Sequence, residues 1–102
     1  MQIDEVTELA GRLAGVRLSA GAGLACWRYH GRLVARQLDD THVVIRADFE
    51  VREGLLRQFP ATFSVPDRFA THMMVVADLV IGDPGAIEDA LIAAWDLQRA
   101  AD

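Results

Sequence analysis

The sequence predicts an α+β domain in which three helices cover an antiparallel sheet of about five strands. Three segments carry apolar residues at helical spacing, and five short segments are rich in β-branched and aromatic residues. Tight turns separate most of the strand segments, and strands joined by tight turns pair antiparallel. Helices with one apolar face each must then pack on the sheet. The expected order is α-β-β-β-α-β-β-α in a single domain over residues 1–102.

The first helix is expected at residues 5–14. Helical spacing is shared by five apolar residues: Ile3, Val6, Leu9, Ala10 and Leu13. Asp4 stands where an N-cap is needed, and Gly15 follows the last turn. The Gly- and Ala-rich stretch at 19–23 is expected to be a loop.

A β-hairpin is expected around His30-Gly31, between strands at 24–29 and 32–38. The two-residue spacing favours a type I′ turn, because Gly adopts a positive φ at little cost and His tolerates it better than a branched residue does. A regular register behind that turn divides the side chains between the two faces of the sheet. One face is predicted to carry Trp27, Tyr29, Val34 and Arg36, and the other Cys26, Arg28, Leu33 and Ala35.

A third strand at 41–48 follows the Asp39-Asp40 turn and leads into the second helix. Asp48 can cap that helix, which is expected over 49–58 because Pro60 stops it.

The remaining chain is predicted to form two strands and a closing helix. A short extended piece at 62–65 is followed by a turn at Pro66-Asp67 and by the most apolar strand, at 72–81. Asp83 is then the N-cap of a helix that begins at Pro84 and reaches about residue 100.

Composition restricts the class of protein. The chain has a formal net charge of −5, and all 10 of its basic residues are arginines. A surface that binds nucleic acid is normally basic, so the total charge argues against a general nucleic-acid binder. The apolar run at 73–77 is too short to span a bilayer, and no secretory start is present, so a cytoplasmic protein is expected. The single cysteine, Cys26, is expected to be buried and inert.

Three stretches of the chain, at 27–56, 63–80 and 83–97, resemble the MmcQ/YjbR family of small bacterial proteins. They read "WRYHGRLVARQLDDTHVVIRADFEVREGLL", "FSVPDRFATHMMVVADLV" and "DPGAIEDALIAAWDL". The shared motifs are the aromatic and basic residues around the hairpin glycine, the Phe69-x-x-His72 entry to the last strand, and an Ala-Trp pair in the final helix. The resemblance implies an α+β fold of the double-wing type and DNA binding as the role.

The strongest candidates for nucleic-acid contact are arginines in and beside the hairpin. The candidate residues are Arg28, Arg32, Arg36 and Arg46. In the functional interpretation their guanidinium groups contact phosphates while the hairpin tip enters a groove. In the alternative interpretation they are solvated sheet residues that pair with acids such as Asp39 and Asp40. The predicted helix starts carry acids, which would repel phosphate there.

Neither metal nor cofactor binding is predicted. The three histidines, His30, His42 and His72, form no HxH or HxxxH pattern, and the acids Asp39 and Asp40 lie in a turn where such residues commonly bond the backbone.

No catalytic signature is present, and the chain is predicted not to be an enzyme. Ser19 and Ser64 lack the surroundings of a nucleophile, and no glycine-rich phosphate loop follows a strand. The segment with Arg68, Phe69 and His72 is the one place where a functional loop could present an acid/base histidine. The alternative is that His72 only bonds locally at the start of a strand.

Two functions therefore remain open from the sequence. The first is a non-enzymatic domain that binds DNA through the hairpin arginines. The second is an acidic module that binds a protein or a small ligand and has no affinity for nucleic acid, using apolar surface near Met73-Met74 or Trp95, or forming a homodimer there. No membrane partner is expected.

Overall fold

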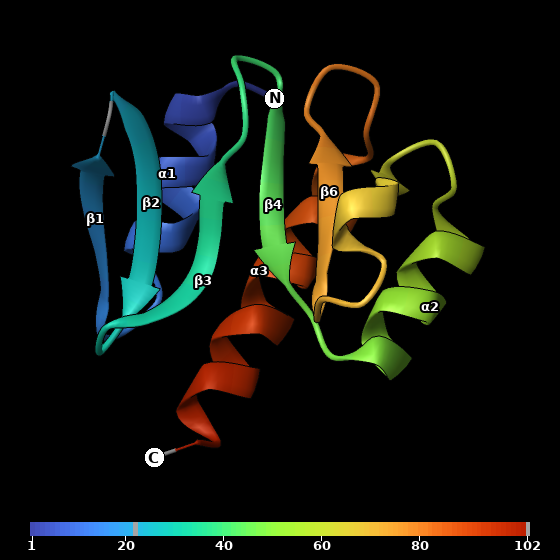
Figure 1. Cartoon of the computed structure of the whole chain (residues 1–102). Helices are drawn as coiled ribbons and strands as arrows, with labels where there is room; N and C mark the ends of the chain where they lie inside the picture. Colours follow the sequence, from blue (N-terminus) through green and yellow to red (C-terminus); the bar gives the residue numbers. More distant parts are fainter. Residues whose placement is uncertain (22, 102) are drawn as a thin grey trace.

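A six-stranded antiparallel sheet with three α-helices makes up the computed structural model within residues 1–21 and 23–101, which are the residues it describes (Figure 1). The predicted α+β class is therefore confirmed. The strand order is β1-β2-β3-β4-β6-β5. The strands are β1 (Val16–Gly21), β2 (Leu24–Tyr29), β3 (Arg32–Gln37), β4 (His42–Arg46), β5 (Phe63–Ser64) and β6 (Met74–Asp78). The helices are α1 (Ile3–Gly11), α2 (Phe49–Gln58) and α3 (Pro84–Arg99), with a 3-10 turn η1 (Asp67–Phe69).

The strand β1 corrects the prediction of a loop at 19–23. Its sequence, VRLSAG, contains small residues of low strand propensity, but all six residues pair with β2, from Val16 opposite Tyr29 to Gly21 opposite Leu24. Pairing with a neighbouring strand thus outweighs the local preference. The observed order is α-β-β-β-β-α-β-β-α. Residue 22, also in the expected loop, lies outside the described residues.

The type I′ turn is confirmed at His30-Gly31. Both residues have positive φ, 47° and 83°. The imidazole ring of His30 stacks on the ring of Tyr29, with 4.0 Å between their centroids.

A β-bulge in the hairpin overturns the predicted division of side chains between the two faces at two positions, Ala35 and Arg36. Trp27 lies opposite Ala35 and Arg28 lies opposite Leu33, so Val34 is the extra residue on β3. One inserted residue moves every later side chain to the other face. Ala35 therefore shares a face with Trp27, whereas Arg36 shares one with its partner Cys26.

The main core lies between the sheet and the helices α1 and α3, which are seen behind the sheet in Figure 1. Its largest fully buried side chains come from both layers and from the β6–α3 loop: Trp27, Ile45, Leu79, Ile87 and Leu91. Helix α2 contacts β5 and β6 at the other end of the sheet. A smaller apolar cluster, made by Val44, Phe69, Met74 and Val76, lies on the opposite face.

The cap predictions hold for two of the three helices. The carboxylate of Asp48 accepts a hydrogen bond from the Val51 N–H at 2.8 Å. That of Asp83 accepts from the N–H groups of Gly85 and Ala86. For the first helix the prediction of Asp4 was wrong, because α1 begins two residues earlier than expected, at Ile3, with Gln2 as its N-cap. No helix in the described part of the chain is long and apolar enough to cross a membrane.

Candidate functional site

Four arginines lie on the face of the sheet that α1 and α3 leave uncovered. The strand register places Arg17, Arg28, Arg36 and Arg46 there, and we call this surface the arginine face. Arg17 on β1 is directly opposite Arg28 on β2, and Arg36 on β3 is opposite both Cys26 and Val44. In Figure 1 no helix stands in front of this face over β1 to β4.

The charges of the arginine face are not neutralised by the fold. Two arginines that face each other across neighbouring strands repel, and the pair destabilises the sheet. Within the described residues, no carboxylate forms a salt bridge with any of the four guanidinium groups. Arg28 donates a long hydrogen bond, 3.4 Å, to the backbone carbonyl of Gly31. An unneutralised like-charge pair on open surface is the arrangement expected of an anion-binding surface.

The side chain of Arg32, the fourth arginine predicted to contact nucleic acid, lies on the helix-covered face of the sheet. It lies opposite Tyr29, and its guanidinium donates to the backbone carbonyl of Gln98 in α3 at 3.0 Å. The side-chain amide of Gln98 donates in turn to the carbonyl of Leu33 at 2.7 Å. These bonds hold the hairpin against α3. The structure thus brings three of the four predicted arginines together and adds Arg17, which was missed because its strand was expected to be partly loop.

The loop with Arg68, Phe69 and His72 borders the arginine face. The ring of Phe69 is buried, and the guanidinium groups of Arg68 and Arg36 lie 4.7 Å and 5.7 Å from its centroid. The His72 ring is 6.0 Å from that of Phe69. Phe69 therefore positions Arg36 at the edge of the face.

Buried Arg52 of α2 holds this loop in place. Its guanidinium donates to the backbone carbonyls of Phe69, Ala70 and His72 at 3.4, 3.1 and 2.8 Å. It also lies over the ring of Phe49 at 4.8 Å. Only 8% of Arg52 is exposed. The carbonyls of Phe69 and His72 also accept the backbone N–H groups of His72 and Met74, so the guanidinium adds a charged donor to a turn that already bonds itself.

The far end of the same face is acidic and contains His42. Its Nδ1 is 3.0 Å from Asp39 Oδ1, and its Nε2 is 3.5 Å from Asp78 Oδ2. Hydrogen bonds from the backbone N–H of Thr41, and then from His42, lower the pKa of Asp39. Hydrogen bonds from the backbone N–H groups of Ile81 and Val80, with a smaller contribution from His42, lower the pKa of Asp78.

Acid unfolding is expected to depend on Asp78. A carboxyl group whose pKa is lower in the folded than in the unfolded chain adds stability above its unfolded pKa, and loses it as the pH falls through its folded pKa. Asp78→Asn should therefore lower the thermal unfolding midpoint near neutral pH, and the two midpoints should converge as the pH falls below 3.8, the ordinary value. Thermal scans by circular dichroism across this range test the prediction. A constant difference between the two proteins at every pH would contradict it.

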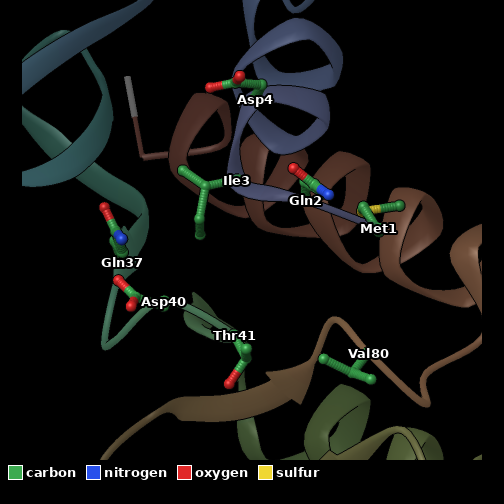
Figure 2. A pocket seen from close by; sticks show the side chains of 8 residues that line it. All are labelled: Met1, Gln2, Ile3, Asp4, Gln37, Asp40, Thr41 and Val80. Carbon is green, nitrogen blue, oxygen red and sulfur yellow. The ribbon is translucent and has the colours of Figure 1, made fainter.

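A polar hollow of about 550 Å³ lies at another edge of the molecule, between the chain start and the β3–β4 turn (Figure 2). Figure 2 shows its lining: Met1, Gln2, Ile3, Asp4, Gln37, Asp40, Thr41 and Val80. The terminal amine of Met1 donates to the carbonyl of Leu79 at 2.8 Å. The charged side chains here are carboxylates, which disfavour a phosphate ligand.

The other chemical candidates do not converge. Among the described residues, no group of three or more His, Cys, Asp or Glu side chains is placed to hold a metal ion. His30 is in the β2–β3 turn and His42 is at the opposite end of the sheet. Ser19 and Ser64 lie on strands at the two opposite edges of the sheet. Cys26, expected to be buried, is half-buried on the arginine face.

Comparisons of the chain with protein families, with curated proteins and with solved structures return no match.

Proposed function

We propose that the chain is a non-enzymatic, cytoplasmic binding domain of the MmcQ/YjbR type that binds DNA through its arginine face. The observation that carries this proposal is the juxtaposition of Arg17 and Arg28 on open sheet, together with Arg36 and Arg46, without a carboxylate partner among the described residues. Guanidinium groups donate several hydrogen bonds to phosphate oxygens, and a cluster of them supports binding of a polyanion.

The distribution of charge reconciles this proposal with a net charge of −5. The helices on the covered side carry many of the acids: Asp4, Glu5 and Glu8 in α1, and Glu88, Asp89 and Asp96 in α3. A polyanion that approaches the opposite face over β1 to β3 meets arginines, away from the acidic end at Asp39 and Asp78. The molecule is thus electrostatically two-sided, and such a field orients a charged ligand as it binds.

Contacts to the backbone, rather than to base edges, fit this surface best. The hairpin aromatics Trp27 and Tyr29 are buried on the covered side and are not available for stacking. Phosphate contacts position nucleic acid without reading its sequence. We therefore expect weak sequence preference.

Fluorescence anisotropy with labelled DNA at several salt concentrations tests the proposal. Arg28→Ala/Arg46→Ala should weaken binding and make the slope of log K against log salt shallower by about 2, one unit for each lost phosphate contact. Arg12→Ala/Arg57→Ala removes the same charge from exposed positions of the helical regions and should leave the slope unchanged. Equal effects of both variants, or no binding at low salt, would overturn the proposal.

A protein-interaction module remains the second candidate, because Val80 and Ile81 are 68% and 67% exposed side by side in the β6–α3 loop. Apolar association through these residues would not weaken as salt rises, whereas phosphate contacts would.

A further inference from the structure

The arginine face contains a hollow of about 320 Å³ over β1, β2 and β3. Its lining includes two of the arginines and a row of small or apolar side chains: Arg28, Arg36, Ser19, Gly21, Leu24 and Cys26. The register explains its position. Ser19 and Arg36 lie opposite Cys26 on either side, and Arg28 is two residues further along β2 on the same face. Short side chains therefore form the floor, and long arginines rise beside it.

The depth of this hollow depends on the β-bulge. Because Val34 is the inserted residue, Arg36 rather than Ala35 lies opposite Cys26. Phe69 then holds the Arg36 guanidinium at 5.7 Å from its ring centroid. The second guanidinium, that of Arg28, belongs to an exposed residue and donates to the carbonyl of Gly31. Two positive groups are thus kept close to an uncharged floor.

The size and lining of the hollow exceed what a phosphate group alone requires. In a duplex the bases are stacked inside the helix, so only phosphates and sugars would reach this surface. In a single strand a base can turn out of the stack, bury apolar surface against Leu24 and Cys26, and place its π-face against an arginine. The phosphate of the same nucleotide is then within reach of the second arginine.

We propose that this hollow seats one unstacked nucleotide of a single-stranded nucleic acid, with Arg28 and Arg36 contacting its phosphate and base. The proposal rests on the proposed function and specifies its substrate class. The domain therefore binds single strands more tightly than duplexes that offer the same number of phosphates.

A variant that fills the hollow without altering charge separates the two proposals. Ser19→Leu places a larger side chain over the floor from the exposed edge strand β1. Ser64→Leu is the matched control, because Ser64 is exposed on the opposite edge strand, β5, and lies on the same face of the sheet. Labelled oligothymidylate and a duplex of equal phosphate count are the probes. Ser19→Leu should abolish the preference for the single strand while Ser64→Leu retains it.

The reactivity of Cys26 reports whether a ligand fills the hollow, since Cys26 is the one cysteine of the sequence and is half-buried in the lining of the hollow. Oligothymidylate should slow the alkylation of Cys26 by N-ethylmaleimide several-fold, and the duplex should slow it less.

Three outcomes would contradict the proposal. Equal affinity for both probes, with no effect of Ser19→Leu on binding and no slowing of Cys26 alkylation, would overturn the nucleotide site and leave phosphate binding intact. Protection by thymidine monophosphate but not by oligothymidylate would assign the hollow to free phosphate esters and overturn the single-strand proposal. Absence of binding to either probe at low salt would remove the proposed function as well.

Discussion

Gly82→Ala is expected to destabilise the fold by about 3 kcal/mol, through a steric conflict that neither neighbour can relieve. A Cβ atom at residue 82 would lie 2.2 Å from the backbone oxygen of Asp78 and 2.9 Å from Cγ2 of Thr62. The same oxygen accepts the Gly82 N–H at 3.0 Å, so the chain is folded tightly on itself here. Any shift would also disturb the bond from the Asp83 N–H to the Thr62 hydroxyl. Chemical denaturation monitored by circular dichroism measures the loss.

A second glycine gives a matched control for this prediction. Gly54 lies in the middle of α2, and a Cβ there would meet nothing within 4 Å. Gly54→Ala should therefore stabilise the protein by up to about 1 kcal/mol, because alanine favours the helix over glycine. If Gly82→Ala unfolded at the same denaturant concentration as the native chain, the tight contact at Asp78 would not be present in solution.

Arg52→Met is expected to cost about 3 kcal/mol and to release the loop that borders the arginine face. Methionine can fill the space of the aliphatic stem, but it donates no hydrogen bond. Three backbone carbonyls, those of Phe69, Ala70 and His72, would lose a charged donor, although those of Phe69 and His72 still accept a backbone N–H. Hydrogen bonds from a charged donor contribute more stability than neutral ones, and three of them are lost together. Denaturant unfolding gives the loss in stability, and amide hydrogen exchange at 69–72 reports the release of the loop.

Arg57→Met is the control for this variant, because Arg57 is an exposed arginine of the same helix. Its substitution should change stability by no more than about 0.5 kcal/mol. Similar effects of the two substitutions would show that Arg52 acts through general charge and not through its three carbonyl contacts.

Local chemistry was sufficient to predict much of the fold. The side chains of Asp48 and Asp83 cap helices, because a carboxylate can reach the free N–H groups of the first turn whatever surrounds it. The turn at His30-Gly31 follows from the positive φ that a two-residue hairpin requires. The helix at 49–58 and the position of the last helix follow from their caps and prolines for the same reason.

Longer-range contacts decided the strand β1 and the composition of the candidate site. Arg17 joins the site only because the weak strand former VRLSAG pairs with β2, and pairing energy is not visible in the segment itself. The sequence identified Arg28 and Arg46 as candidates from their residue type, but it could not show that Arg32 would bond the carbonyl of Gln98, 66 residues further along the chain.

The amino-acid sequence by itself determined the class of the fold, its turns and two of its three helix caps, because these depend on neighbouring residues and on the periodicity of apolar side chains. Only the tertiary structure decided that Arg36 lies on the same face as Arg28. The bulge at Val34 places Arg36 beside Cys26 and Arg28, and a single inserted residue is enough to exchange the faces. The position of the inserted residue depends on the pairing of β3 with β2 and β4 and on its packing against α3. No local pattern of residues specifies these contacts.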